Sequence, residues 1–150
     1  MIDENAAQLG LTTSVVAHEA GFGGESWTAG SCISSFRALF PVFPSILQIV
    51  SPRRTGITTL AELSAQDIGV EPSGSSSATV LPSLFRSLGI IPRNIVSGDY
   101  SDQLHDMLTG KLAACAFIGA PPVPAIFSIA MGQKLSLIGF SSAEAQQSPI

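Results

Sequence analysis

The stretch Val70–Gly89, VEPSGSSSATVLPSLFRSLG, contains the turn that decides the fold. It begins at the end of a β-like run, passes through Pro72 and Gly74, and meets three serines ahead of a helix-like pattern. Gly89 closes that pattern, as glycine commonly does at the C-terminus of a helix. The stretch therefore predicts a strand over 68–71, a short loop, and a helix over 75–88.

The same order of elements recurs along the chain. Further strands are expected over 46–51, 94–97, 113–118 and 135–138, and further helices over 60–63, 101–108 and 121–131. Strands that alternate with helices predict an α/β fold with a mostly parallel sheet, covered by helices on both faces and joined by right-handed crossovers. Ahead of this region we expect short strands over 8–11 and 37–40 and a helix over 15–20.

The composition excludes several classes of protein. Of 150 residues, 45% are hydrophobic and 12% are charged, and the net charge is -4. The seven Lys and Arg residues are scattered, so we expect no nucleic-acid partner. Cys32 and Cys115 stand in no metal-ligand spacing and are interpreted as free, mostly buried thiols. The N-terminus has neither the basic nor the apolar segment of a signal peptide.

One uncharged stretch, Leu112–Gln133, has the length of a membrane span. Gly119, Pro121, Pro122 and Pro124 interrupt its middle. A single helix through these prolines would lose backbone hydrogen bonds that lipid cannot replace. The stretch is therefore predicted to be a buried strand, a tight turn, and a helix that the prolines begin.

The serine loop, residues 72–77, has the properties of an anion site. Ligands of open α/β sheets bind at the carboxyl ends of the strands, where this loop is expected. The helix that follows offers free N–H groups and a partial positive charge, and Gly74 allows close backbone approach. With the hydroxyls of Ser75, Ser76 and Ser77, this suits a carboxylate or a phosphate. The alternative is that one serine caps the helix and the others face solvent.

The chain offers no pattern that favours catalysis. The serine loop lacks the lysine of a P-loop, the glycines of a dinucleotide fingerprint, and the spacing of a nucleophile elbow. His18 and His105 are interpreted as surface or core residues. No carboxylate pair or metal-ligand cluster stands out, so we predict no catalytic residue, metal or cofactor.

Two other junctions share the character of the serine loop. Residues 117–124, FIGAPPVP, join a predicted strand to a predicted helix, and residues 12–14, TTS, lie at an earlier junction of the same kind. Three such junctions with small polar, glycine or proline residues are predicted to line one small-molecule cleft.

The order of these motifs resembles the TAXI-type solute receptors of TRAP transporters. The segments that carry the resemblance are LGLTTSVVAHEAGFGG, FRALFPVFPSILQIVSPRRTGITTLAEL, IGVEPSGSSSATVLPSLFRSLGI, YSDQLHDMLTGKLAACAFIGAPPVPAIFSIA and LSLIGF. They cover the chain from about Asn5 to Phe140. By this resemblance we expect the chain to be truncated at both ends, without the signal peptide, the opening βαβ unit and the segment that returns to the first lobe.

The resemblance implies a periplasmic binding protein of type II, which is a two-lobe clamp and not an enzyme. On this basis residues 1–52 are a fragment of the first lobe and the crossover, 53–138 the second α/β lobe, and 139–150 a tail or stub that returns to the first lobe. The ligand is expected to be a small organic anion, such as glutamate or a related carboxylate. The expected location is the periplasm, and the expected partners are membrane TRAP permease subunits.

The resemblance also assigns the ligand-binding residues. They are Gly74, Ser75, Ser76 and Ser77 at the serine loop, Thr13 and Ser14 at the early junction, Gly119, Ala120 and Pro121 at the late junction, and Phe43 against the apolar part of the ligand. The alternative for Phe43 is a core aromatic. The alternative for the whole chain is a ligand-sensing domain or a degenerate binding protein that forms a homo-oligomer to cover its exposed surface. An enzyme of similar architecture is a third alternative.

Overall fold

The computed structural model describes residues 8–23, 28 and 30–147. The chain separates into two compact units, Met1–Phe43 and Pro44–Ile150. The predicted lobe boundary at residue 53 concerns the complete two-lobe protein and stays a prediction.

The first unit contains one helix, α1 (Ser14–Phe22), among its described residues. It begins after Thr13 and ends at Gly23, so the helix predicted over 15–20 is confirmed and is slightly longer. The strands predicted over 8–11 and 37–40 are wrong, since both segments lack regular structure. Leu9, Leu11, Leu39 and Phe40 are all exposed there, and among the described residues neither segment is part of the sheet.

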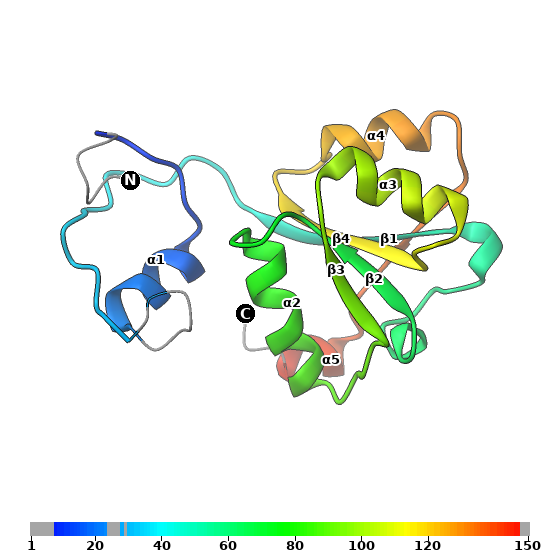
Figure 1. The fold of residues 1–150 in the computed structure, drawn as a ribbon, viewed down its shortest axis with the longest axis horizontal. Coiled ribbons are helices and arrows are strands. Elements are labelled where there is room, and N and C mark those ends of the chain that lie inside the picture. Colours follow the sequence, from blue (N-terminus) through cyan, green and yellow to red (C-terminus); the bar gives the residue numbers. More distant parts are fainter. Residues whose placement is uncertain (1–7, 24–27, 29, 148–150) are drawn as a thin grey trace. The chain divides into compact units, whose positions relative to one another are not determined.

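The second unit is built on a five-stranded sheet (Figure 1). Its spatial order is β3 (Asn94–Ser97), β2 (Asp67–Val70), β4 (Ala114–Gly119), β1 (Ile46–Pro52) and β5 (Leu135–Ile138). Strand β2 pairs in parallel with β3 and β4, whereas β1 pairs antiparallel with β4 and β5. All strands except β1 therefore run in one direction, which confirms the predicted mostly parallel sheet.

Helices connect the strands near the predicted positions. They are α2 (Ser76–Ser87), α3 (Tyr100–Thr109), α4 (Pro124–Ala130) and α5 (Ser142–Gln147), with 3-10 turns η2 (Arg53–Thr55) and η3 (Ala61–Leu63). The helix predicted over 60–63 is thus a 3-10 turn. The helix predicted from residue 121 begins only at Pro124, because a proline keeps the residue before it extended, as Val123 is.

Alternate residues of the central strands point into two separate cores. Ile49 of β1 and Ala114 and Ala116 of β4 pack with α2 on one face of the sheet. Val50 of β1 and Cys115 and Phe117 of β4 form the other core, with residues of α3 and α4. Successive residues of a strand point to opposite faces of the sheet. Because helices cover both faces here, the central strands carry apolar residues toward both faces and not toward one face only. The result is a three-layer α/β/α unit with α2 on one face and α3 and α4 on the other (Figure 1).

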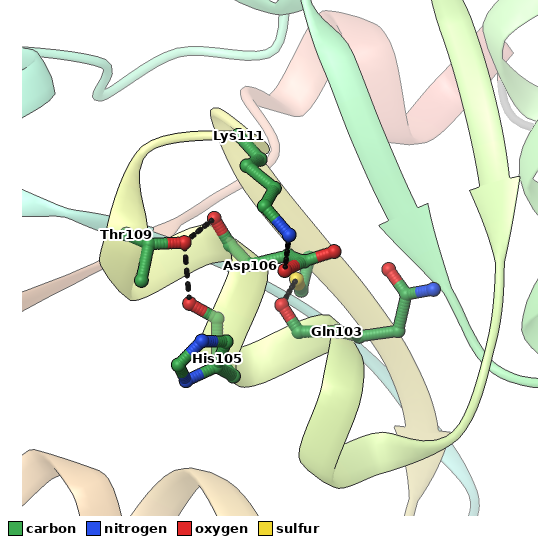
Figure 2. A network of polar contacts seen from close by, with 6 residues as sticks. Gln103, His105, Asp106, Thr109 and Lys111 are labelled. Carbon is green, nitrogen blue, oxygen red and sulfur yellow. Dashed lines mark hydrogen bonds and ion pairs between the residues drawn. The ribbon is translucent and has the colours of Figure 1, made fainter.

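Helix α3 lies unusually close to the sheet at Gly69. A methyl group there would overlap the Gln103 side chain and would lie 2.8 Å from Leu112 Cδ1 and 2.9 Å from Cys115 Sγ. The Cys115 thiol donates to the Gln103 carbonyl at 3.3 Å. Figure 2 shows Gln103 and the end of α3, where Lys111 pairs with Asp106 at 2.7 Å. The missing side chain at residue 69 therefore sets the spacing between helix and sheet.

The uncharged stretch Leu112–Gln133 folds as predicted into a strand, a turn and a helix, β4 and α4. Within the part of the chain that the structure describes, every helix is too short or too polar to cross a membrane.

Candidate functional site

The strand-to-helix junctions that follow β2, β3 and β4 lie together at the carboxyl ends of these strands. Because β2, β3 and β4 are parallel neighbours, they all end on the same side. Residues 71–75 follow β2, 98–99 follow β3, and 120–123 follow β4. The first and last of these were predicted from the sequence, whereas the junction at 98–99 was missed.

The serine loop ends in a helix cap. Ser75 is the N-cap of α2, and its Oγ accepts a hydrogen bond from the backbone N–H of Ala78 at 3.2 Å. Gly74 has φ +86°, the left-handed conformation that glycine adopts without strain. The capping alternative is therefore correct for Ser75. Ser75 and Ser76 are partly buried, and the loop brings both to the start of a twelve-residue helix.

Ser77 faces inward instead of toward a ligand. It is fully buried, and its Oγ accepts from the backbone N–H of Glu71 at 3.2 Å and lies 3.3 Å from Ser75 Oγ. Ser77 thus joins the two ends of the loop, whereas Ser75 and Ser76 are only partly buried.

Glu71, which the sequence did not single out, connects all three junctions. Only 7% of its surface is exposed. Its Oε2 accepts from the backbone N–H of Ile118 in β4 at 2.9 Å, and its Oε1 accepts from the hydroxyl of Tyr100 at the start of α3. A buried carboxylate requires such donors, because desolvation without them is costly. The signal that could have found Glu71 is an acidic residue directly after a buried strand.

Tyr100 forms the other half of this contact. Its ring stacks on Phe117 with 5.2 Å between the ring centroids and 13° between the planes. Burial, and then the hydrogen bond to Glu71 and its negative charge, raise the pKa of Tyr100 to about 12. The phenol therefore stays protonated and donates to Glu71 at neutral pH.

The late junction presents small and apolar groups. Gly119 is the last residue of β4, and its carbonyl accepts from Gln48 Nε2 at 3.5 Å. Gly119 and Ala120 are partly buried, Pro121 is exposed, and Val123 is buried beneath the start of α4. These residues lie at the same end of the strands as the serine loop, because β4 is the parallel neighbour of β2. These residues can contribute surface contacts to a site, but they carry no charge.

The remaining predicted residues belong to the first unit. Thr13 is the N-cap of α1, and its Oγ1 accepts from the backbone N–H of Val16 at 3.3 Å. Ser14 is the first residue of that helix, and Phe43 is exposed at the end of the unit. Their part in a cleft with the serine loop stays a prediction.

The histidines and cysteines of the chain are distributed over both units. His18 is in α1 beside Phe22, with 4.3 Å between the ring centroids, and His105 is exposed on α3 (Figure 2). Among the described residues, no three His, Cys, Asp or Glu side chains gather to hold a metal. Both cysteines are free, but only Cys115 is buried; Cys32 is exposed, contrary to the prediction. Burial raises the pKa of the Cys115 thiol to about 12.

The family of the chain is established by a match over almost its whole length. The model of the NMT1-like family matches residues 1–149. The chain belongs to the NMT1-like family. The match is to the NMT1-like family and not specifically to the TAXI-type receptors that the sequence resembles.

Solved structures with a similar fold are solute-binding proteins. One is the second substrate binding domain of a putative amino acid ABC transporter from Streptococcus pneumoniae Canada MDR_19A, with 22% identity, TM-score 0.52, and coverage of 65% of this chain and 42% of that one. Another is a polar amino acid ABC uptake transporter substrate binding protein from Streptococcus thermophilus, with 16% identity, TM-score 0.53, and coverage of 65% and 38%. A third, an ABC uptake transporter substrate binding protein from Streptococcus pneumoniae with bound histidine, has 17% identity, TM-score 0.53, and coverage of 65% and 41%.

These likenesses concern the fold. The NMT1-like chain has the α/β fold of a periplasmic binding protein lobe, as predicted. It spans less than half the length of each of these three proteins.

Proposed function

We propose that this chain is part of a solute-binding receptor that captures a small organic anion, with glutamate and related carboxylates as the expected class. The observation that supports this most directly is the serine loop at the start of α2, next to the β4 junction at the same sheet edge. Helix N-termini and small hydroxyl side chains suit a carboxylate. The role is binding and release, without chemical change of the ligand.

The ligand carboxylate would lie against Gly74, Ser75 and Ser76, and Gly119, Ala120 and Pro121 would border it on the β4 side. Glu71 does not compete with the ligand for donors of the loop, because its two oxygens already accept hydrogen bonds from Tyr100 and Ile118. In the complete protein, Thr13, Ser14 and Phe43 would approach from the other lobe as the clamp closes.

The serine site is tested by a change that keeps the helix cap and reverses the local charge. Asp is as good an N-cap as Ser, so Ser75→Asp should leave stability nearly unchanged while it repels a carboxylate. Calorimetric titration of the chain with L-glutamate and with succinate should give binding to the wild type, weakened at least about tenfold by Ser75→Asp.

The matched control is Ser83→Asp, which adds the same charge at an exposed position of the same helix. It should bind like the wild type. The proposal is wrong if no small carboxylate binds the wild-type chain, or if Ser75→Asp binds as tightly as Ser83→Asp.

We also propose that the receptor serves a TRAP-type permease, as the sequence resemblance implies, and acts outside the cytoplasmic membrane. The test is co-purification with the TRAP permease subunits of the same source, with an ABC permease as the control. Retention by the ABC permease alone would contradict this assignment.

A homo-oligomer is the second candidate, and a specific observation favours it. Strand β5 is an edge strand, with Leu137 67% exposed. Phe127 and Met131, on and directly after α4, are also exposed. Pairing between two β5 edges would cover such surface. Light scattering distinguishes the candidates, because a monomer at all concentrations contradicts the oligomer.

A further inference from the structure

A small basic hollow lies at the opposite end of the strands from the serine loop. Its volume is about 330 Å³, and it is lined by Pro52, Arg53, Arg54, Gly132, Gln133 and Lys134. Pro52 is the last residue of β1. The first residue of β1, Ile46, pairs with Gly119, which lies at the same end of the strands as the serine loop. At about 3.3 Å per strand residue, the two ends of β1 are roughly 20 Å apart. The hollow is therefore separate from the proposed carboxylate site.

The hollow is positively charged, whereas the chain as a whole is negatively charged. The net charge is -4, yet three of the seven basic side chains, those of Arg53, Arg54 and Lys134, meet here. All three are exposed. Within the described residues none of them has a carboxylate partner, whereas Arg93 pairs with Asp67 and Lys111 with Asp106.

Backbone carbonyls hold the two arginines in place. Arg53 donates from Nε to the carbonyl of Leu135 at 3.2 Å, and its backbone N–H donates to the carbonyl of Lys134 at 2.9 Å. Arg54 donates from Nη2 to the carbonyls of Met107 and Leu108 at 3.1 and 2.7 Å, at the end of α3. A guanidinium has five N–H donors, so each arginine keeps several for a ligand while its orientation is already fixed.

Three cationic residues that line one hollow favour an anion within it, because its charge offsets their mutual repulsion. Fixed guanidinium groups match the oxygen atoms of a phosphate in charge and geometry, and a lysine adds a mobile third charge. We propose that this hollow binds a multiply charged oxyanion of the phosphate class. This site is independent of the carboxylate site and of its proposed function.

The test is a calorimetric titration of the whole chain with inorganic pyrophosphate at physiological ionic strength. The wild type should show saturable binding. Lys134→Gln removes one charge and breaks no side-chain contact seen in the structure, so it should weaken binding roughly tenfold. Arg93→Gln, which lowers the net charge equally outside the hollow, should change the affinity less than about twofold. A thermal melt confirms that both variants fold.

The source of the phosphate group is a separate arm of the experiment. Vesicles of equal parts phosphatidylglycerol and phosphatidylcholine should bind the chain, with release by pyrophosphate, if the natural ligand is a lipid headgroup. Pyrophosphate binding without vesicle binding assigns a free anion. The proposal is overturned if pyrophosphate gives no saturable binding, or if Arg93→Gln weakens it as much as Lys134→Gln.

Discussion

Glu71 is the single residue that connects most of the candidate site. Its carboxylate accepts from Tyr100 of α3 and from the backbone of Ile118 in β4, and the backbone of Glu71 donates to Ser77 of α2. The position of the serine loop relative to the neighbouring junctions therefore depends on one buried side chain.

Replacement of Glu71 by leucine should destabilise the fold. Glu71→Leu leaves the Ile118 N–H and the Tyr100 hydroxyl without an acceptor, which should lower the free energy of unfolding by about 2–3 kcal/mol. Glu71→Gln keeps the shape and one acceptor, so it should cost less. Urea denaturation of the three proteins measures both effects, and equal stability of Glu71→Leu and wild type would show that the contact contributes nothing.

Tyr100 should make stability fall at alkaline pH. Its folded pKa, about 12, lies above the ordinary tyrosine pKa of 10.0, so the native state holds the proton more tightly than the unfolded chain. The corresponding stability is fully present below pH 10 and is lost as the pH rises toward 12.

The chain contains one tyrosine, so the near-ultraviolet absorbance of tyrosinate reports Tyr100 alone. The titration midpoint should lie well above that of the denatured chain and should fall in Glu71→Gln, which removes the neighbouring charge. A midpoint near 10 in the native wild type would disagree with the buried contact.

At this scale the sequence predicted local chemistry better than contacts between strands. The helix cap could be predicted from the spacing of serines ahead of a helical pattern, and Ser75 provides it. The position of Glu71 after a buried strand marks it as a candidate, but its contacts with Tyr100 and Ile118 could not be predicted, because they depend on how α3 and β4 pack beside β2. The inward position of Ser77 could not be predicted either, because residue type alone does not distinguish it from Ser75 and Ser76. The sequence does not reveal whether a given serine or glutamate side chain points toward a ligand or into the protein interior.

Among the elements, the contact between α3 and the sheet gives the clearest prediction. Gly69→Ala would push against Gln103, Leu112 and Cys115, and should destabilise the second unit by roughly 1–3 kcal/mol. Gly132→Ala is the control, since a methyl group there meets nothing within 4 Å. Thermal melts of the two variants should therefore differ, and equal melting temperatures would mean that α3 shifts freely.

Most element positions in the second unit could be predicted, because apolar runs and glycine or proline boundaries mark them. Strands β3 and β5 match the predicted ranges, and α2 and α3 differ by a residue or so at each end. The reversed direction of β1 was not predictable, since an apolar strand buried on both faces reads the same in either direction. The strands predicted over 8–11 and 37–40 were wrong, because a short apolar segment does not reveal whether a partner strand is available.

For the whole molecule, the second unit should fold without the first. All five strands and both apolar cores lie within 44–150. A fragment of those residues should therefore keep the far-ultraviolet circular dichroism of an α/β protein and unfold cooperatively. A fragment that melts without a transition would show that the sheet needs residues 1–43.

The α/β class of the molecule followed from the alternation of elements. The relation between the two units did not, because the cleft predicted from Thr13, Ser14 and the serine loop joins residues of different units. Short-range patterns define each junction, whereas a cleft depends on contacts that no local pattern encodes.

The place of β1 in the sheet has a consequence for how the protein reaches its native state. The first strand of the sheet to leave the ribosome occupies an interior position, and its partners come much later: Gln48 and Gly119, which are hydrogen-bonded, are 71 residues apart. Such high contact order slows folding, because the loop must close before the pairing is gained. During synthesis β1 is an apolar segment with both ladders unpaired, so it is the natural point for a chaperone to bind or for aggregation to begin.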